Sequence, residues 1–345
     1  MQAVLRQAVS MAQAPANHCK VVLASAVAKS LLAEVTADLK RFDRKPQLHG
    51  FLANEDPAAR KYADWTAKTC RENGFDFTLR EVDREQLEET LQHANTDDAV
   101  DGMIVYYPVF DTRRDTTLQW TVSMYKDVEG LTPQLISNMY QNVRFLDPPT
   151  NKFKSILPCT PLAMLKILEY LQIYNTILDY GQRLYGRRIT VINRSEVVGR
   201  PLAALLANDG ADVYSVDITG VQHFSRGSGL KKTMHEVREM EGWGLKEALA
   251  HSDVVISGVP GDNFKVPTEW IRDGAVCINF SSEKNFHPEV KEKASIYVPA
   301  IGKVTIVMLM RNLLRIAKHR PMSRPSSPTG FRPEQPAATT NDPMA

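Results

Sequence analysis

The chain has 345 residues, enough for about two domains of ordinary size; 43% of them are hydrophobic and 24% are charged. This composition is typical of globular proteins and excludes disorder along the whole chain. The 42 basic and 40 acidic residues leave a net charge of +2 without a basic stripe, and no apolar run approaches the roughly 18 residues of a membrane span. We therefore expect neither a nucleic acid nor a membrane as a partner.

The four cysteines, at positions 19, 70, 159 and 277, are scattered along the chain. There is no C-x-x-C pair and no pair of histidines at zinc-binding spacing, so we predict reduced thiols, no metal and a cytoplasmic location. The segment before Glu34 contains no acidic residue, which leaves a mitochondrial presequence as the alternative.

Regular patterning begins at residues 21–24, so residues 1–18 are expected to form a flexible extension. From there, short apolar runs alternate with helical patterns, which indicates an α/β protein with mostly parallel strands. The predicted strands are 48–52, 76–80, 102–106, 188–193, 212–216, 253–257, 275–279 and 296–298, and the predicted helices are 57–73, 85–94, 160–173, 200–209, 244–251 and 304–318. Residues 321–345 contain six prolines and are expected to form a disordered tail.

A proline-rich break near residues 147–150 separates two domains. The last predicted helix, 304–318, is apolar on one side, and we expect it to return to the first domain. The first domain would then comprise residues 19–157 together with 304–320, and the second would comprise residues 158–303.

The second domain contains a strand, a short loop, a helix, a second strand and then Asp217, which is the order of a dinucleotide-binding βαβ unit. In such a unit the helix N-terminus offers free N–H groups to a pyrophosphate, and glycine permits close backbone approach. Only one glycine of the G-x-G-x-x-G pattern is present, so an ordinary βαβ unit remains an alternative, as does a turn-capping role for Asp217. The candidate cofactor-binding residues are Arg194, Ser195, Val198, Gly199, Pro201 and Asp217.

Asp217 also bears on the choice of nicotinamide cofactor. A carboxylate that accepts a hydrogen bond from a ribose 2′-hydroxyl contributes about 1.5–3 kcal/mol. The same carboxylate would be repelled by a 2′-phosphate by about 4 kcal/mol per pair of unit charges at close range. The sequence therefore favours NAD over NADP, although Arg194 could serve a 2′-phosphate as well as the pyrophosphate.

Several motifs along the chain resemble those of the methylenetetrahydrofolate dehydrogenase family. They are the helix that carries Tyr62, KDVEG at 126–130, LPCTP at 157–161 and NRSEVVGRP at 193–201. The resemblance covers residues 20–318 and is strongest to the monofunctional NAD-dependent fungal members. It implies a folate-binding α/β domain, a Rossmann-type doubly wound parallel sheet and a cleft between them. It also implies the substrate 5,10-methylenetetrahydrofolate, with or without a polyglutamate chain, a homodimer, and a place in one-carbon metabolism and purine biosynthesis.

Three departures from the bifunctional relatives define the expected subtype. Those relatives carry a lysine four residues after the catalytic tyrosine, which the cyclohydrolase step requires, whereas Thr66 occupies that position here. Lys68 lies about 200° around the helix from Thr66 and cannot replace it. Glu129 and Tyr106 stand where those relatives have aspartate and glutamine, and the segment 298–305 is shorter than its counterpart. We therefore expect NAD-dependent oxidation of methylenetetrahydrofolate without cyclohydrolase activity.

The resemblance assigns a role to each candidate site residue. Glu129 would bind the pterin and stabilise the cationic product, Tyr62 would stack on the folate, and Thr66 would hold a water molecule or the substrate. Tyr106 would contact the ligand at the end of its strand, and Cys159, Pro299 and Gly302 would line the folate site. The alternatives are an exposed acid before a turn for Glu129 and simple packing for the two tyrosines. For the whole protein, the alternatives are a bifunctional dehydrogenase/cyclohydrolase and a catalytically silent nucleotide-binding regulatory protein.

Overall fold

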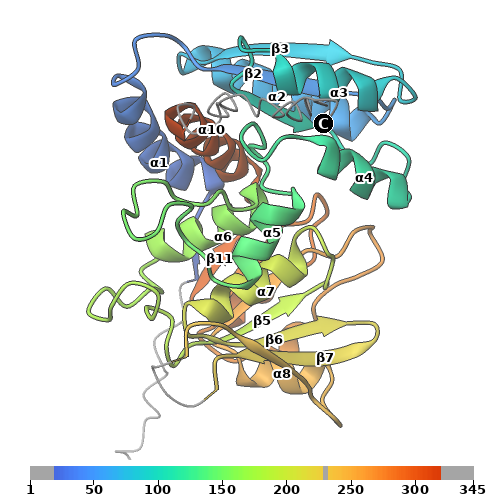
Figure 1. Ribbon diagram of the computed structural model, residues 1–345. Coiled ribbons are helices and arrows are strands. Elements are labelled where there is room, and N and C mark those ends of the chain that lie inside the picture. The colour runs from blue at the N-terminus through green and yellow to red at the C-terminus, as the bar shows by residue number, and fades with distance from the viewer. Residues whose placement is uncertain (1–18, 228–231, 320–345) are drawn as a thin grey trace, which may run out of the picture.

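The computed structural model describes residues 19–227 and 232–319, which form the two α/β domains seen at the top and bottom of Figure 1. The predicted extension 1–18 and tail 321–345 lie outside the described residues. Within the described ranges, no helix combines the length and the apolar character needed to cross a membrane.

The first domain is built on a three-stranded parallel sheet with the order β3 (Asp76–Glu81), β2 (Gln47–Leu52), β4 (Gly102–Val105). Its helices are α1 (Ala24–Leu39), α2 (Pro57–Glu72), α3 (Leu87–Thr96), α4 (Arg113–Thr121), α5 (Pro133–Tyr140) and α10 (Gly302–His319). Helix α2 begins as predicted, because the Asp56 side chain accepts the N–H of Ala58 and Pro57 occupies the first turn.

The expected return of the last helix is confirmed, since α10 packs against α1, α2 and β4 of the first domain. Gly102 on β4 permits α10 to approach the strand closely. A Cβ atom at this position would lie 2.7 Å from Cδ1 of Leu313 on α10. The last helix therefore packs directly on β4, an edge strand of this sheet.

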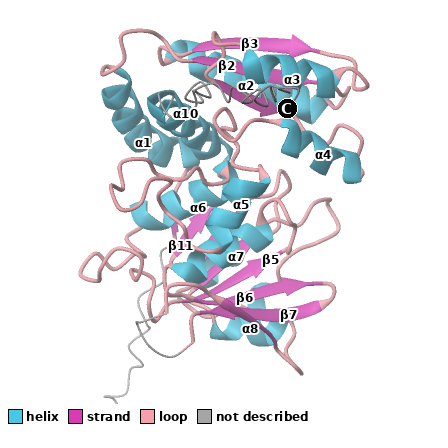
Figure 2. Cartoon of the chain, viewed as in Figure 1, coloured by secondary structure: helices cyan, strands magenta, loops and turns pink. Residues whose placement is uncertain are grey.

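The second domain is an eight-stranded sheet with the order β1-β11-β10-β9-β5-β6-β7-β8. Its strands are β1 (Lys20–Val21), β5 (Arg188–Ile192), β6 (Asp212–Asp217), β7 (Gly220–Ser225), β8 (Glu236–Glu239), β9 (Val254–Ser257), β10 (Val276–Asn279) and β11 (Ile296–Val298). Helices α6 (Cys159–Tyr170) and α7 (Gly199–Asn208) lie on the side facing the first domain, and α8 (Leu245–His251) lies on the other side (Figure 2). The short elements η1 (Thr268–Trp270) and α9 (Val290–Lys293) complete it. The doubly wound α/β prediction is confirmed.

The structure differs from the sequence prediction at two places in the large sheet. Strand β1 pairs in parallel with β11, so residues 20–21 belong to the second sheet although the predicted boundary assigns them to the first domain. A strand of two residues is too short to show an alternating pattern. Strands β7 and β8 were not predicted and add an antiparallel edge to β6. Helices α1, α4 and α5 were also missed.

Candidate active site

The KDVEG segment folds around the buried carboxylate of Asp127. Its Oδ1 atom accepts the N–H groups of Glu129 (3.0 Å) and Gly130 (2.8 Å), and Oδ2 accepts the N–H of Thr132 (2.8 Å). Gly130 has φ +73°, and a Cβ atom there would lie 2.8 Å from the carbonyl carbon of Leu157. Glycine is therefore required where the KDVEG turn meets the LPCTP segment.

Glu129 lies half-buried beside the carboxyl end of β4. Its Oε2 atom accepts the N–H of Val105 at 3.0 Å. Burial raises the pKa of Glu129 to about 8, the Val105 N–H opposes the shift and the charge of Asp127 adds to it. Near neutral pH this acid therefore exists in both protonation states, and a cation placed against it would favour the ionised form.

Two tyrosines and a threonine form the wall next to Glu129. The rings of Tyr62 on α2 and Tyr106 at the end of β4 meet edge to face, with centroids 5.9 Å apart. Thr66 is fully buried, and its hydroxyl donates to the carbonyl oxygen of Tyr62 at 2.8 Å. The Tyr106 hydroxyl is also buried, with the Thr66 side chain as its polar neighbour. The structure thus brings Tyr62, Thr66, Tyr106 and Glu129 together.

Lys68 lies away from this wall, as its position on the helix predicts. Its side chain is 72% exposed and its Nζ atom lies 3.9 Å from Glu72. Thr66 occupies the turn of α2 next to Tyr62 but keeps its hydroxyl proton on the helix backbone. The wall therefore presents hydroxyl groups and a carboxyl group, and Lys68 adds no amine to it.

Cys159 lies at the start of α6, where its thiol donates to the carbonyl oxygen of Val128 at 3.1 Å. Burial, followed by the charges of Glu129 and Asp127, raises the pKa of Cys159 well above its usual range. A buried thiol of this kind is a poor nucleophile. The structure agrees with a role in lining the site and offers nothing to a thiolate mechanism.

Asn312 was missed by the sequence analysis, although it joins both motifs. Its Nδ2 atom donates to the carbonyl oxygens of Val128 and Leu157, each at 2.9 Å. A fully buried asparagine inside the apolar helix α10 was the available signal. Through this side chain the last helix fixes the segments that carry Glu129 and Cys159.

In the second domain, the strand order reverses between β5 and β9, and ligands bind at such a switch point in doubly wound sheets. The Asn193 side chain spans this point by donating to the carbonyl oxygen of Gly258 at 2.7 Å. Helix α7 begins at Gly199, where a Cβ atom would lie only 1.8 Å from the Asn193 carbonyl oxygen. The Ser195 hydroxyl accepts the Gly199 N–H at 3.2 Å. The single glycine therefore serves close packing of the helix start on the strand end.

The remaining loop residues frame this helix start. Val198 is the residue immediately before α7, and Pro201 is buried in its first turn. A proline in the first turn costs no helical hydrogen bond, because the N–H groups there have no partner within the helix. Both residues thus lie where a pyrophosphate would approach.

Asp217 and Arg194 bond to protein groups in the structure. The Asp217 carboxylate accepts the N–H groups of Arg194 (2.6 Å) and Ile218 (2.8 Å), as the turn-capping alternative expects. It stays half-exposed, and a carboxylate that accepts two bonds keeps lone pairs for a ribose hydroxyl. The Arg194 guanidinium donates to the carbonyl oxygens of Ser215 (2.7 Å) and Gly220 (2.8 Å), which makes it a brace of the β6–β7 turn.

The carboxyl ends of β9, β10 and β11 lie along the same edge of the sheet. Asn279, which ends β10, donates to the carbonyl oxygen of Pro299 at 3.2 Å. A Cβ atom on Gly258 would lie 1.9 Å from the ring of Phe280. Gly258 and Asn279 were not among the predicted site residues, although both directly end or follow predicted strands. Gly302 starts α10 with open space around it, so no contact requires glycine there.

The fold and the site define a class of two-domain α/β proteins, in which a doubly wound dinucleotide-type sheet accompanies an acid-lined site on a smaller sheet. Residues 22–129 match the family described as "Tetrahydrofolate dehydrogenase/cyclohydrolase, catalytic domain", and residues 158–227 match its "NAD(P)-binding domain". The chain belongs to this family.

Individual relatives within the family differ in how similar their sequences are to this chain. The chain is 55% identical over 307 residues to "Methylenetetrahydrofolate dehydrogenase [NAD(+)]" of Schizosaccharomyces pombe, covering 89% of this chain and 95% of the relative. The solved structure of the NAD-dependent 5,10-methylenetetrahydrofolate dehydrogenase from Saccharomyces cerevisiae is 52% identical in sequence, with a TM-score of 0.84, and the match covers 88% of this chain and 99% of that one. The "Bifunctional protein FolD" of Thermus thermophilus is 26% identical over 304 residues, covering 84% of this chain and 93% of the relative.

Proposed function

We propose that the protein oxidises 5,10-methylenetetrahydrofolate to 5,10-methenyltetrahydrofolate by hydride transfer to NAD and does not hydrolyse the product. The observation that carries this proposal is the half-buried Glu129 beside Tyr62, with threonine in place of an amine at position 66. Relatives more than 50% identical carry the corresponding name.

The residues at the switch point fit NAD. The N-terminal end of α7 lies at the switch point, where the helix dipole favours a pyrophosphate, and the half-exposed Asp217 carboxylate accepts a hydrogen bond from a ribose 2′-hydroxyl while repelling a 2′-phosphate. When bound, NAD supplies the hydride acceptor. The protein's part is to hold the two reactants in register, and the edge formed by Gly258, Asn279 and Pro299 is the surface available for that purpose.

Glu129 supplies the electrostatic part of the mechanism. Loss of hydride leaves a positive charge shared by two folate nitrogens, and a nearby carboxylate stabilises that charge. No proton leaves carbon, so no strong general base is needed. Because the pKa of Glu129 is raised to about 8, only part of the enzyme carries the ionised carboxylate near neutral pH, and that ionised form is the one that stabilises the developing cation.

The absence of cyclohydrolase activity follows from Thr66. Hydrolysis of the methenyl product needs a proton donor beside the folate. The Thr66 proton is held by the Tyr62 carbonyl oxygen, and Lys68 lies on the solvent side of α2. Neither side chain can do what a cationic amine does at this position.

A spectrophotometric assay with methylenetetrahydrofolate, run in parallel with NAD and NADP, tests the proposal. We expect turnover with NAD, weak turnover with NADP, and methenyltetrahydrofolate hydrolysis no faster than the spontaneous rate. Turnover with neither cofactor would instead support the silent regulatory protein, and hydrolysis above the spontaneous rate would support the bifunctional enzyme.

The proposal extends to the polyglutamylated form of the substrate. A groove of about 500 Å³ lies between α1, α2 and α10, on the helix that carries Tyr62, and Lys29, Lys68 and Lys303 line it. Glu72 also lines the groove and lies 3.9 Å from Lys68, so the lining keeps a net positive charge, which suits a chain of carboxylates. We expect a lower KM for the pentaglutamate than for the monoglutamate, and equal values would remove this part of the proposal.

We further propose a homodimer in the cytoplasm that supplies one-carbon units to purine biosynthesis. The location is supported by four free thiols, three of them buried, which suit a reducing compartment. The dimer rests on the family resemblance alone. Light scattering of the purified protein tests the dimer, and microscopy of a tagged chain tests the location against the mitochondrial alternative.

A further inference from the structure

A cavity of about 140 Å³ lies between α10, α6 and the loops that follow α5 and α6, among residues to which the proposed function assigns no role. Six cationic side chains and two carboxylates line it. The cations are Arg144, Lys154, Lys166, Arg183, Arg311 and Arg315, and the carboxylates belong to Glu169 and Asp209. Positive charge therefore exceeds negative charge in a partly enclosed space.

The two carboxylates are already paired. Arg144 contacts Asp209 at 2.5 Å, and the Tyr174 hydroxyl donates to the same carboxylate at 3.0 Å. Lys166 contacts Glu169 at 2.5 Å. Neither acid is thus available to the remaining cations of the cavity.

Those remaining cations have weak partners or none. Arg311 lies 3.7 Å from Glu34, and Arg183 donates its Nε–H to the carbonyl oxygen of Leu178. Arg315 is half-buried and makes no hydrogen bond or ion pair with any residue in the described ranges. Burial and the neighbouring charge of Arg311 lower the pKa of Arg315 to about 10, which marks a guanidinium whose charge is poorly compensated.

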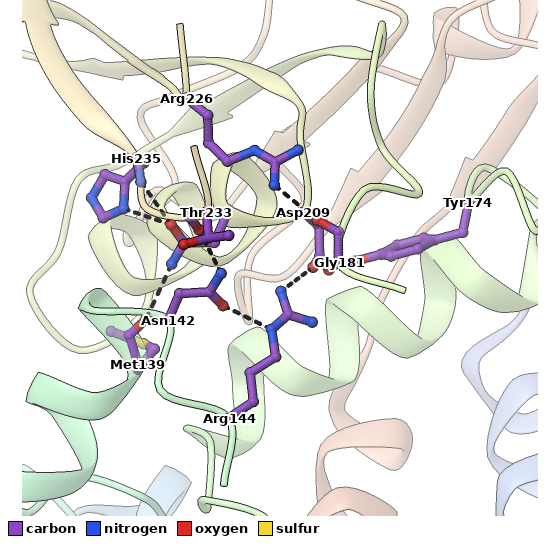
Figure 3. Close-up of polar contacts among 10 residues, drawn as sticks. Met139, Asn142, Arg144, Tyr174, Gly181, Asp209, Arg226, Thr233 and His235 are labelled. Carbon is purple, nitrogen blue, oxygen red and sulfur yellow. Dashed lines mark hydrogen bonds and ion pairs between the residues drawn. The ribbon is translucent and has the colours of Figure 1, made fainter. Parts of the chain in front are cut away.

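The Asn142 side chain donates to the carbonyl oxygen of Thr233 in the second domain at 2.5 Å, and further hydrogen bonds within each domain fix the wall of the cavity (Figure 3). The Arg144 Nε–H donates to the Asn142 side chain at 2.8 Å, while the Arg226 guanidinium donates to the carbonyl oxygen of Gly181 at 3.1 Å. Across the mouth, the Tyr180 ring lies 4.9 Å from the Arg144 guanidinium carbon and 5.8 Å from the Lys154 Nζ atom. Arg144 and Lys154 are thus held in place by protein contacts.

The size of the cavity limits what it can hold. A cavity of roughly 150 Å³ accommodates one benzene-sized molecule, so a tetrahedral oxyanion fits here and a nucleotide does not. A second cavity of about 380 Å³ shares Lys154, Arg311 and Arg315 with the first, and its lining adds the cations Arg41, Lys152 and Lys318 and the carboxylates of Glu34 and Asp38. A phosphate group in the inner cavity could therefore carry a small substituent in the outer one.

We propose that this pocket binds the phosphate group of a small anion, with Arg315 and Arg311 as its main ligands from α10. Guanidinium groups match phosphate oxygens in a bidentate fashion, which gives arginine an advantage over lysine at such sites. The proposal does not depend on the dehydrogenase activity.

Calorimetric titration of the NAD-saturated protein with inorganic phosphate tests the proposal, since bound NAD keeps phosphate out of the pyrophosphate site. We expect saturable binding that weakens on the order of tenfold or more in Arg315→Gln and less in Arg315→Lys. Arg80→Gln is the matched control, because Arg80 on β3 is also half-buried and lies outside both cavities. Its dissociation constant should stay within about twofold of the unaltered protein.

A parallel titration with ribose 5-phosphate distinguishes the two sources of the phosphate group. Tighter binding than that of inorganic phosphate assigns the site to phosphomonoesters, and weaker binding assigns it to free phosphate. Absence of saturable binding of both, or an equal response to acetate at matched ionic strength, would overturn the proposal. If Arg315→Gln does not fold, Arg311→Gln replaces it, and undiminished phosphate affinity in the folded variant would overturn the proposal.

Discussion

At the scale of single residues, the ionisation of Glu129 controls the chemistry. Its pKa is raised to about 8 by burial, so in the free enzyme the ionised fraction increases as the pH rises through that value. We expect kcat/KM to rise toward alkaline pH with an apparent pKa near 8. In the pH profile of kcat, the same rise should occur at lower pH, because the developing folate cation favours the carboxylate.

The substitution Glu129→Gln should abolish the rise of kcat/KM with pH. Turnover should fall by about 10²-fold or more, as on removal of one electrostatic group aimed at a developing charge. The dissociation constant of NAD should change little, because Glu129 lies on the first domain and the proposed NAD site lies on the second. Steady-state kinetics from pH 6 to 9 and fluorescence titration with NAD measure the two effects. An unchanged pH profile would remove Glu129 from the mechanism.

Asp217 decides between the two nicotinamide cofactors. Asp217→Ser removes the repulsion of a 2′-phosphate, so we expect the ratio of kcat/KM for NAD to that for NADP to fall by about tenfold or more. The variant also loses the carboxylate that accepts the Arg194 N–H, and some loss of NAD affinity accompanies the change. Asp217→Asn keeps the size and an acceptor oxygen and serves as the comparison. A cofactor ratio that stays constant in both variants contradicts the ribose role.

At the scale of elements, two helices that both begin with glycine respond differently to alanine. At Gly199 a Cβ atom would lie 1.8 Å from the Asn193 carbonyl oxygen, so Gly199→Ala must push α7 away from the end of β5. We expect a loss of about 3 kcal/mol in unfolding free energy and weaker NAD binding. Gly302→Ala, at the open start of α10, should be neutral or stabilise by up to about 1 kcal/mol. If urea denaturation gave the same change in unfolding free energy for both variants, the close contact between Gly199 and Asn193 would not limit stability.

Asn312 links α10 to the folate site. Asn312→Leu leaves the Leu157 carbonyl oxygen without its donor and the Val128 carbonyl oxygen with the Cys159 thiol alone, which should cost about 1–3 kcal/mol for the group left unsatisfied. Because these segments carry Glu129 and Cys159, KM for the folate should rise while the dissociation constant of NAD stays unchanged. Leu313→Val, a neighbouring apolar change on the same helix, is the control for general loss of packing. A folate KM that rises equally in both variants assigns Asn312 to stability alone.

Elements with a strong local pattern could be predicted from the sequence. The unit β5–α7–β6 lies within two residues of its predicted bounds, since its apolar runs and turn residues are local signals. The β7–β8 edge could not be predicted, because polar residues such as Gln222 and His223 alternate with few apolar ones. The roles of Asn312 and Arg194 depend on partners far along the chain, 155 and 184 residues away for Asn312. Spacing cannot reveal such contacts.

At the scale of the whole molecule, one large hydrophobic cluster runs through both domains, in addition to a smaller cluster in each. A single cluster of buried residues contains Leu48 and Ile104 from the first sheet and Val191 and Ile256 from the second, with α6 and α10 packed on each other between the sheets. Because this cluster crosses the boundary between the domains, separating them would expose buried apolar side chains to water. We therefore expect them to unfold in one cooperative transition.

Tryptophan fluorescence can test this expectation, since Trp65 and Trp120 lie in the first domain and Trp243 and Trp270 in the second. Variants that keep one pair, with phenylalanine at the other two positions, should report the same midpoint in urea. NAD at about 100 times its dissociation constant should shift both midpoints together, by the equivalent of about 2.7 kcal/mol. If NAD raised only the midpoint reported by Trp243 and Trp270, the shared core would not couple the domains, and folate binding would have to organise the first domain separately.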